Sequence, residues 1–556
     1  MMTSVLHAQQ IIQLFKKRDI KNIIISPGSR NAPLTISFSQ DSFFNCYSIV
    51  DERCAGHFAM GIAQQLQEPT VLLCTSGSAL LNYYPAVAEA YYSEIPLIVL
   101  SADRPPHKID IGDGQTIRQK HVFANHILFD TQLEMITRSD QKEYLITNER
   151  QLNKAINTAI SKHGPVHINV PFEEPLYNTV EQPSMDVKVM DVLKDETTEI
   201  PAAFYENWNN SKRKLVILST LNPPVFEKED IDRLTADGSV LVMSEVSSNI
   251  VHENIVWGID TLIAPIEFDD DQIAALQPDM VVTIGGMIVS KKIKQYLRRF
   301  ETNIHYHIGK RRAYDTFFKL AAHIKIAPRK WLHSLPVQTQ PSTYQEQWLH
   351  HFKDYLSKRP AYFEKIGWSD MKVFELLFEH LPDDIVLQLG NSSTIRYAQL
   401  FKMNATHRIF SNRGTSGIDG CTSTAIGAAV GSGMPTVLIT GDLSFFYDSN
   451  GLWNNYIPKN FKIILINNSG GGIFRILPGE KQEVYFSTYF ETTHHLDASH
   501  LCAMHGFGYT KIDEEFAFAK AYQQFIHTNT APQLLEIQTP REINDKILLD
   551  YFKFLR

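Results

Sequence analysis

The most constraining feature of the sequence is the alternation of short apolar runs with helical patterns along almost the whole chain. Three early apolar runs each end in a polar turn and read "NIIISPGSR", "TVLLCTSGS" and "PLIVLSADRPP". A helix-like segment, "ALLNYYPAVAEAYY", lies between the second and the third. Strand, helix and strand in this order form the βαβ unit, so we expect an α/β protein with mainly parallel sheets covered on both faces.

The length of the chain predicts more than one domain, because 556 residues exceed what one core can hold. Polar stretches with weak periodicity separate three α/β segments, for which we expect the ranges 1–178, 198–330 and 345–556. In the first and third segments one strand is expected to begin 26 residues after another, at Val71 and Leu97 and at Thr436 and Lys462. This spacing is weak support for a duplicated fold, since any compact βαβ unit gives similar numbers.

Charge and cysteine content argue against several classes of protein. The net charge is −8 and there is no basic tract, so a nucleic-acid partner is not expected. The five cysteines are odd in number and form no C-x-x-C pair, so neither a disulfide framework nor a zinc ribbon is expected. The sequence shows no signal peptide and no apolar run near the roughly 18 residues of a membrane span. We therefore expect a cytoplasmic protein without a membrane partner.

Two polar turns in the third segment predict a metal site. Asp442 comes just after the run "TVLIT", and Asn468 follows the next run, "KIILIN". Both strands of a βαβ unit end at the same edge of the sheet, so the two side chains should lie close together. Their oxygens, with the carbonyls of the glycines that follow, suit Mg²⁺. The alternative interpretation is that Asp442 caps a helix and that the glycines only turn the chain.

These turns resemble the cofactor motif of the thiamine diphosphate-dependent enzymes, which is Gly-Asp, an interval of this size, and then Asn-Asn. The resemblance implies a pyrimidine-binding domain, a middle domain and a diphosphate-binding domain in this order. It implies that Gly441, Asp442 and Leu443 contact thiamine diphosphate, and that Asp442, Asn468 and the Gly470 carbonyl hold Mg²⁺, with Mn²⁺ as the alternative ion. Leu443 replaces the glycine that usually follows Gly-Asp, whereas the acid and the amide are kept.

Glu52, in "IVDERCAGHFAMGIA", is the candidate catalytic residue. An apolar strand is expected to end at Asp51-Glu52-Arg53, where a helix of small residues begins. By themselves, two acids at this place are explained by the helix dipole, which favours them in the first turn. The resemblance implies a further role, in which a shielded glutamate holds the pyrimidine tautomer whose amino group removes the thiazolium proton.

Arginines at other predicted strand ends indicate an anionic substrate. The turns "SPGSRNAP", "SADRPP", "GNSSTIR" and "NRGTSGIDG" contain Arg30, Arg104, Arg396 and Arg413. Arginine binds carboxylates through paired hydrogen bonds, so several arginines on one face predict several substrate carboxylates. Taken singly, each arginine would be assigned to a surface salt bridge.

Together these segments resemble the 2-succinyl-5-enolpyruvyl-6-hydroxy-3-cyclohexene-1-carboxylate synthases of menaquinone biosynthesis. The matching stretches run from Ser26 to Phe474 and include "SPGSRNAPL", "DERCAGHFAMGIA", "GQTIRQ", "SNRGTSGIDG" and "NNSGGGIF". The resemblance implies a transferase that decarboxylates 2-oxoglutarate on thiamine diphosphate and adds the resulting carbanion to isochorismate. Both substrates are dicarboxylates, which agrees with the arginines.

The resemblance also assigns site residues by motif. Those implied to bind the substrates and intermediate are Ser29, Arg30, Arg104, Gln115, Lys292, Asn391, Ser392, Arg396 and Arg413. Those implied to form an apolar wall around the bent cofactor are Ile418, Ile473, Phe474 and Leu477. Ordinary core packing is the alternative for each apolar residue, and a solvated lysine pair is the alternative for Lys292.

The position of the expected residues also predicts the assembly. Glu52 lies in the first segment and Asp442 in the third, yet both must touch one cofactor. The resemblance implies that the two residues come from different chains, which makes a homodimer with two shared sites the minimum unit. Whether such dimers pair into a homotetramer is left open.

Three other functions fit part of the sequence. An acetohydroxyacid synthase-like enzyme would bind flavin in its middle domain and use monocarboxylates. A non-catalytic binding protein on the same fold would be indicated by loss of Glu52 or Asp442, and both are present. A nucleotide-binding protein would bind nucleotides and not thiamine diphosphate. The middle segment has "VVTIGG" but no G-x-G-x-x-G, so we expect a dinucleotide fold without a dinucleotide.

Overall fold

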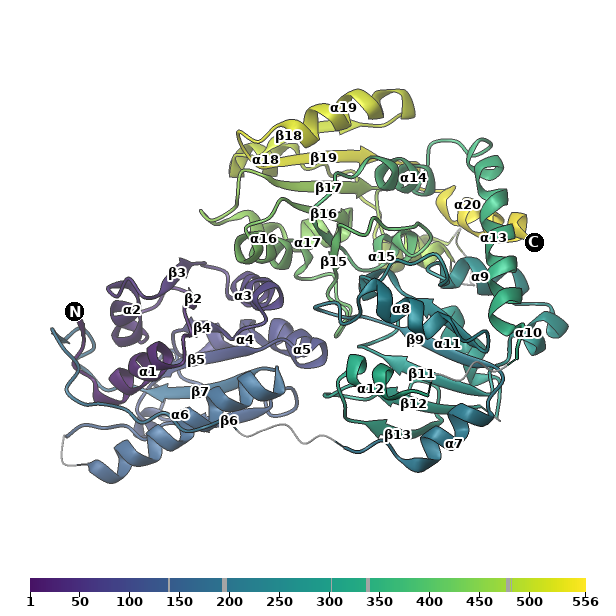
Figure 1. The fold of residues 1–556 in the computed structure, drawn as a ribbon. Coiled ribbons are helices and arrows are strands. Elements are labelled where there is room, and N and C mark those ends of the chain that lie inside the picture. Colours follow the sequence, from purple (N-terminus) through teal and green to yellow (C-terminus); the bar gives the residue numbers. More distant parts are fainter. Residues whose placement is uncertain (139–140, 193–197, 302, 337–340, 477–480, 482) are drawn as a thin grey trace.

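The structure is a computed structural model that describes residues 1–138, 141–192, 198–301, 303–336, 341–476, 481 and 483–556. Figure 1 shows three α/β domains along the chain, the first in purple and blue, the middle one in teal and the third in green and yellow. The α/β class and the mainly parallel sheets predicted from the sequence are confirmed. Among the described residues, no helix is both long enough and apolar enough to cross a membrane.

The first domain is built around a six-stranded parallel sheet with strand order β3-β2-β4-β5-β7-β6. A short antiparallel pair, β1 with β8, joins its two ends. The strands are β1 Met2–Thr3, β2 Asn22–Ile25, β3 Asn45–Ser48, β4 Thr70–Cys74, β5 Leu97–Asp103, β6 Phe129–Gln132, β7 Val166–Pro171 and β8 Thr179–Val180. The helices are α1 Leu6–Lys17, α2 Ala32–Ser39, α3 Glu52–Leu66, α4 Ser78–Asn82, α5 Tyr84–Ser93 and α6 Lys142–Lys162.

The third domain has a six-stranded parallel sheet of order β15-β14-β16-β17-β19-β18. Its strands are β14 Val386–Leu389, β15 Arg408–Phe410, β16 Thr436–Gly441, β17 Phe461–Asn467, β18 Gly508–Ile512 and β19 Gln533–Gln538. Its helices are α13 Tyr344–Phe363, α14 Asp370–His380, α15 Ser393–Ala398, α16 Cys421–Ser432, α17 Asp442–Tyr447, α18 Ser499–His505, α19 Glu515–His527 and α20 Asn544–Leu555.

The sheets of the first and third domains share one topology. If each large sheet's strands are numbered in chain order, the spatial order is 2-1-3-4-6-5 in both sheets. The weak sequence indication of a duplicated fold therefore has a structural counterpart. Central strands such as β4 and β17 are buried at every position, as expected for parallel strands covered on both faces.

The middle domain has a five-stranded parallel sheet of order β10-β9-β11-β12-β13. Its strands are β9 Lys214–Leu218, β10 Val240–Ser244, β11 Met280–Ile284, β12 Ile304–Ile308 and β13 Leu320–Ile324. Its helices are α7 Ala202–Asn210, α8 Lys228–Thr235, α9 Ile259–Ile266, α10 Asp270–Leu276, α11 Lys291–Arg298 and α12 Pro328–Ser334. Trp331 of α12 is fully buried in the core of this domain and lies one residue past 330, the predicted end of the domain. The predicted domain limits stay a prediction.

The strand before Glu52 differs from the expected apolar strand. Strand β3 ends at Ser48 and its side chains are exposed or half-buried. It lies at the edge of the first sheet, where a strand pairs with only one neighbouring strand and is less buried than a central strand. An edge strand does not need a continuous apolar run, which explains the mismatch.

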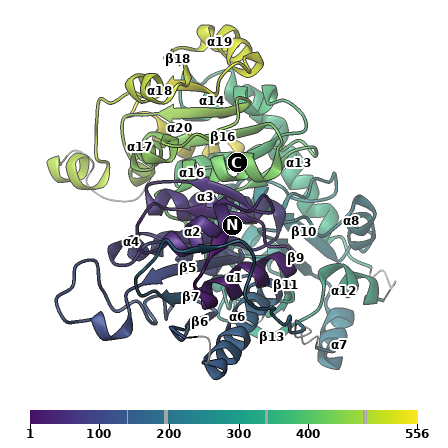
Figure 2. The same cartoon turned by 90° about the vertical axis from the view of Figure 1, so that its left-hand side faces the viewer.

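Helices α3 and α16 join the first and third domains, and Figure 2 shows them beside each other. A Cβ added at Gly61 would lie 2.1 Å from the Thr424 carbonyl oxygen. A Cβ added at Gly427 would lie 2.0 Å from the Phe58 carbonyl oxygen. Only glycine permits such a close approach of two helix backbones, so these residues fix how the domains meet.

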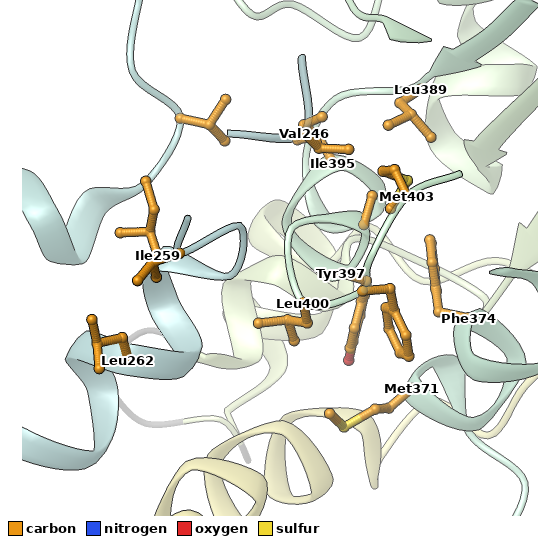
Figure 3. Packing of buried hydrophobic residues seen from close by; sticks show 14 of the residues in the cluster. Val246, Ile259, Leu262, Met371, Phe374, Leu389, Ile395, Tyr397, Leu400 and Met403 are labelled. Atoms are coloured by element: carbon orange, nitrogen blue, oxygen red, sulfur yellow. The ribbon is translucent and has the colours of Figure 1, made fainter. Parts of the chain in front are cut away.

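A shared apolar cluster joins the middle and third domains. Figure 3 shows Val246 and Ile259 of the middle domain in this cluster with Ile395 and Leu400 of the third. The Ile409 N–H donates to Asn249 Oδ1 at 2.6 Å, and Asn249 Nδ2 donates to the Ile409 carbonyl at 3.0 Å. The carboxyl end of β10 is therefore fixed against strand β15.

Candidate active site

The order of the third sheet places one ligand site at its carboxyl edge. The strand order reverses between β14 and β16, which are neighbours. Ligands of open α/β sheets bind at such a switch point. Strand β14 leads into Asn391 and Ser392, and β16 leads into Asp442, so the expected substrate and metal residues meet there.

Asp442 connects the two turns that the sequence places 26 residues apart. Its side chain is buried, and Oδ2 accepts the Gly470 N–H at 2.9 Å. The same oxygen lies 3.1 Å from His494 Nε2, and Oδ1 accepts the Leu443 N–H at 2.7 Å. The expected proximity of the two strand ends is thus present. The N-cap of α17 is Gly441 and Asp442 is the first residue of the helix, so the alternative interpretation of Asp442 as the cap is wrong.

Asn468 and Gly470 complete a set of oxygen donors beside Asp442. Asn468 Nδ2 donates to Asp370 Oδ2 at 2.9 Å, and no described residue donates to its Oδ1. Gly470 has φ +150°, and a Cβ there would lie 2.7 Å from the Glu491 carbonyl oxygen, so only glycine fits. A carboxylate, an amide oxygen and a backbone carbonyl are the hard ligands that Mg²⁺ prefers.

This donor set differs from a cluster of metal-binding side chains. In the described part of the chain, no group of three or more His, Cys, Asp or Glu residues could hold a metal ion. A site with one carboxylate, one amide and one carbonyl leaves positions for oxygens of a ligand such as a diphosphate. The residues therefore fit Mg²⁺ bound together with a phosphate-bearing cofactor.

Glu52 stands at the first position of α3 but does not cap that helix. Asp51 is the N-cap, since its Oδ1 accepts the N–H groups of Arg53 at 3.0 Å and Cys54 at 3.2 Å. Burial raises the pKa of Glu52, and the charge of Asp51 adds to this, while a hydrogen bond with Asn82 opposes it. Capping is therefore done by its neighbour, and Glu52 is a half-buried acid free for another role.

The predicted residues of the first domain gather at the carboxyl ends of its strands. Arg30 is buried and donates to the Phe172 carbonyl and to Glu174, both at 3.1 Å. Arg104 donates to the Gly114 carbonyl at 3.4 Å. Ser29 is exposed in the turn before α2, and Gln115 has a left-handed φ of +56° beside Gly77.

Asn391 organises the predicted residues of the third domain. Its Nδ2 donates to the carbonyls of Asn412 at 2.8 Å and Gly417 at 2.7 Å, and its Oδ1 accepts from Arg413 at 2.8 Å. Arg396 donates to the Ser392 carbonyl at 3.1 Å. Burial lowers the pKa of Arg396, and the positive charge of Arg413 lowers it further. Two half-buried arginines thus lie close enough at the switch point for their charges to interact.

Several of these arginines keep a buried donor without a partner. The Nε–H groups of Arg30, Arg104 and Arg413 are buried, and no hydrogen bond to them is formed by the described residues. Buried donors are rarely left unpaired in folded proteins. A ligand carboxylate would satisfy them through charge-assisted hydrogen bonds.

Lys292 lies at the border of the site. Its Nζ is 2.6 Å from Glu267 and 5.6 Å from the centre of the Phe552 ring. Burial raises the pKa of Asp260, and the positive charges of Lys292 and Arg396 both oppose that rise. The lysine therefore lies near the arginines, on the side of the middle domain. Glu267 already neutralises this lysine in the structure.

The predicted apolar wall is only partly described. The Ile418 carbonyl accepts the Ser444 hydroxyl at 2.9 Å, which holds Ile418 near the start of α17. Ile473 and Phe474 are half-buried in the short helix η4, Gly472–Ile476, and the Phe474 ring lies 6.1 Å from that of Phe490. Leu477 lies outside the described residues.

Sequence reasoning missed four acids and one histidine that support the site. Glu89 of α5 accepts the N–H groups of Gly414 and Thr415, each at 2.6 Å, and so holds the turn that carries Arg413. Others are Asp370 and His494 beside the metal donors and Glu245 and Asp260 near the arginines. None stands in a recognisable motif, because each acts through a contact distant in sequence.

Known proteins resemble this chain in sequence and in fold. Residues 7–132 match the N-terminal TPP binding domain of thiamine pyrophosphate enzymes, and residues 390–537 match their C-terminal TPP binding domain. Two proteins named 2-succinyl-5-enolpyruvyl-6-hydroxy-3-cyclohexene-1-carboxylate synthase, from Flavobacterium psychrophilum and Flavobacterium johnsoniae, are each 51% identical over 99% of this chain and 98% of their own length.

A solved structure shares the fold at low sequence identity. A protein from Mycobacterium smegmatis, described as a candidate thiamin diphosphate-dependent enzyme, superposes with a TM-score of 0.69 at 16% identity. The match covers 96% of this chain and 99% of that one. At this level of identity, the match supports the three-domain fold alone.

Proposed function

Because the chain belongs to the 2-succinyl-5-enolpyruvyl-6-hydroxy-3-cyclohexene-1-carboxylate synthases, thiamine diphosphate-dependent transferases of menaquinone biosynthesis, we propose that the residues described above form its active site. The reaction decarboxylates 2-oxoglutarate and joins the remaining succinyl unit to isochorismate, releasing CO₂. The observation that carries the assignment of the site is the set of buried, unpaired Nε–H groups on Arg30, Arg104 and Arg413. They match two substrates that are both dicarboxylates.

Asp442, Asn468 and the Gly470 carbonyl would hold Mg²⁺, or Mn²⁺ in its place, and with it the diphosphate of the cofactor. Thiamine diphosphate, when bound, would supply a nucleophilic carbon for the oxo group of the substrate and an electron sink for decarboxylation. The contact between the buried Asp442 carboxylate and the Gly470 N–H supports this assignment, because it brings the two turns that carry the three proposed ligands together. Gly441 and Leu443 flank the carboxylate and would contact the diphosphate.

Glu52 would hold a proton against the pyrimidine ring of the cofactor. Its raised pKa and its freedom from the capping role support this assignment. The apolar side chains Ile418, Ile473, Phe474 and Leu477 would exclude water from the reacting carbon. Exclusion of water protects a carbanion from protonation before the second substrate arrives.

The arginines divide into two groups that would bind substrate carboxylates from opposite sides. Arg30 and Arg104, with Ser29 and Gln115, belong to the first domain. The other group comes from the middle and third domains and consists of Lys292, Asn391, Ser392, Arg396 and Arg413. Among the described residues, no hydrogen bond or ion pair joins the side chains of the first group or of Glu52 to those of the second.

This separation supports a homodimer in which each site is shared between two chains. Glu52 contacts Asn82 of its own domain, whereas Asp442 contacts Gly470 and His494 of the third. Large apolar side chains near both halves are exposed, including Val50, Leu81, Tyr447, Trp453 and Tyr489. Exposed apolar surface of this kind favours an interface, and a two-fold interface would bring the first domain of one chain to the third domain of the other.

The compartment is also part of the proposal. All five cysteines are free thiols in the structure, and four of them are buried. Free cysteines are typical of a reducing compartment, which supports a cytoplasmic enzyme.

Product analysis tests the proposed function directly. The purified protein is incubated with thiamine diphosphate, Mg²⁺, 2-oxoglutarate and isochorismate, and the product is identified by mass. The expected result is the synthase product with one CO₂ released per turnover. Pyruvate in place of 2-oxoglutarate is the matched control, because it lacks the second carboxylate and should react poorly. Release of CO₂ without the joined product would contradict the proposal.

A further inference from the structure

We propose that Glu245 of the middle domain is a positioning residue for Arg413. It balances the charge of Arg413, and it fixes the turn that leads into α11. The inference rests on the substrate-binding role proposed above for Arg413. It gives the middle domain, which supplies only Lys292 to the predicted site, a second part in the reaction.

Glu245 is held by its own domain at the carboxyl end of β10. It is 1% exposed. One carboxylate oxygen accepts the Val289 N–H at 2.6 Å, and the other accepts the Ser290 N–H at 2.7 Å. Two strong backbone hydrogen bonds fix the carboxylate and, equally, fix the turn before α11.

Ser290 links the Glu245 carboxylate to the basic helix α11. Its hydroxyl donates to Asp260 Oδ1 and accepts the Ile293 N–H at 3.1 Å, so it is the N-cap of α11. The helix carries Lys292 and Lys294, and Lys294 Nζ donates to the Ile288 carbonyl at 3.0 Å. The Glu245 carboxylate therefore fixes the start of a helix that carries two cations, of which Lys294 is close enough to Arg413 for their charges to interact.

The residues that follow Glu245 are tied to the third domain. The Val246 N–H donates to Gln399 Oε1 at 3.2 Å, and Asn249 exchanges two hydrogen bonds with Ile409. Figure 3 shows Val246 in the apolar cluster that also contains Ile395 of α15. Ile409 lies in β15, the strand that leads into Arg413, so the position of Glu245 is fixed relative to that arginine.

The charges agree with this geometry. Burial raises the pKa of Glu245 to about 7, and the positive charge of Arg413 opposes the rise. Burial lowers the pKa of Arg413, and Glu245 is the foremost opposing charge, ahead of Glu89. The other charged groups that face Glu245 are Asp260 of α9 and Lys294 of α11. The charges of the buried Glu245 and the half-buried Arg413 thus each favour the ionised form of the other.

The test is the variant Glu245→Gln in the holoenzyme. Glutamine keeps the size of the side chain, but its NH₂ group faces a backbone N–H where an oxygen is needed, and the counter-charge is lost. Arg413→Lys is measured first, because it identifies which substrate Arg413 binds. We expect the KM of that same substrate to rise about tenfold in Glu245→Gln, with a smaller change in kcat. Affinity for thiamine diphosphate, measured by fluorescence quenching, should be unchanged.

A pH profile separates positioning from a general structural role. Protonation of Glu245 removes an acceptor from the turn, so the wild-type KM should rise as pH falls from 8 to 6, through the raised pKa of about 7. The substrate carboxylates stay ionised over this range. In Glu245→Gln the KM should be high and nearly independent of pH.

Two further variants complete the design. Asp230→Asn removes a buried acid of α8 that bonds Arg329 and His333, away from the arginines of the site, and should leave the KM unchanged. Ser290→Ala removes the link to Asp260 but keeps the backbone N–H that donates to Glu245, and it should raise the same KM more mildly. It replaces Glu245→Gln as the test if that variant does not fold.

The outcomes are distinguishable. An unchanged KM in Glu245→Gln, with a raised KM in Arg413→Lys, overturns the positioning role and leaves the proposed function intact. A lowered KM also overturns it, because Glu245 would then only oppose the anionic substrate. An unchanged KM in Arg413→Lys contradicts the proposed role of Arg413, and the inference falls with it.

Discussion

Arg413 donates a hydrogen bond from a terminal guanidinium nitrogen to Asn391 Oδ1 at 2.8 Å, which ties the ends of the neighbouring strands β14 and β15. Its Nε–H is buried and unpaired among the described residues. The protein thus fixes one terminal nitrogen of the guanidinium, which orients the arginine. A substrate carboxylate is the partner proposed for the edge that contains Nε.

The first prediction concerns this free edge. Arg413→Lys keeps the positive charge but loses the paired donors, and Arg396→Lys should act similarly. We expect the KM of a dicarboxylate substrate to rise about tenfold or more, with intact cofactor binding, in steady-state kinetics. Arg213→Lys, which changes an ion pair with Asp279 outside the site, is the control. Equal kinetics for arginine and lysine at both site positions would show that neither contacts a carboxylate.

The second prediction concerns Glu52. Glu52→Gln is nearly isosteric but cannot share a proton with the pyrimidine ring. Turnover should fall by roughly 100-fold or more, while thiamine diphosphate affinity from calorimetry is largely kept. Glu68→Gln, an exposed acid just beyond α3, should behave as wild type. Near-normal turnover in Glu52→Gln would remove this residue from the mechanism.

The third prediction concerns the metal. Asp442→Ala removes the charged ligand, so cofactor affinity should fall and excess Mg²⁺ should restore it only in part. Asn468→Ala removes a neutral ligand and should have a milder effect. Chelation of the metal should release the cofactor from the wild-type protein. If Asp442→Ala binds the cofactor as wild type does, Asp442 is not a metal ligand.

The fourth prediction concerns the shared site. Homodimers of Glu52→Gln and of Asp442→Ala should each be nearly inactive. In a mixed dimer both lesions fall in one site and the other site is wild type. After unfolding and random reassembly, half of the dimers are mixed, so roughly a quarter of full activity should return.

The control for subunit mixing is the exchange itself, followed with differently tagged chains separated by affinity. If exchange is complete and no activity returns, each site is built within one chain and the shared-site arrangement is wrong.

The fifth prediction concerns acid stability. Burial lowers the pKa of His7 and His305 to about 4 and that of His307 to about 3. Histidines of the unfolded chain bind protons near pH 6.5, so folding stability is complete above that pH and is lost as pH falls below it. Each histidine should cost about 1.4 kcal/mol per pH unit in this window.

The measurement is urea unfolding at pH 7.5 and 5.5. His7→Gln should show a smaller loss between the two pH values than wild type does. His527→Gln is the control, because His527 is exposed and bonds only Gln523 of its own helix. An equal loss in wild type and His7→Gln would show that His7 is not the group that takes up the proton.

The sequence alone was sufficient for the central strands and their ends. Runs such as "TVLLC" and "FKIILIN" are continuous and apolar because both faces of a parallel strand are buried, so local composition identifies them. Strands β6, β13 and β18 were not predicted, and all three lie at sheet edges, where burial is incomplete and polar residues are tolerated. Strand β12, "IHYHI", was missed because its two histidines interrupt the apolar run, although the strand is almost entirely buried.

The candidate site shows the same division. Asp442, Asn468 and Asn391 could be found from the sequence because each follows an apolar strand in a polar or glycine-rich turn, which is a local signal. The roles of Asp51 as helix cap and of Glu52 as a free acid could not be separated, since both fit the first turn of a helix. Only the hydrogen bonds of the folded chain distinguish them.

What the sequence determined by itself is therefore the order of strands and helices and the residues at the strand ends, because these depend on neighbours in the chain. What only the tertiary structure decided is which residues from distant parts of the chain contact those strand-end residues. Glu245 accepts the Val289 N–H in the turn before α11, 44 residues away in the sequence, and Glu89 accepts the Gly414 N–H just after Arg413, 325 residues away. The physical reason is that an isolated acid carries no pattern, and its burial, its partners and its pKa arise only when distant segments pack together.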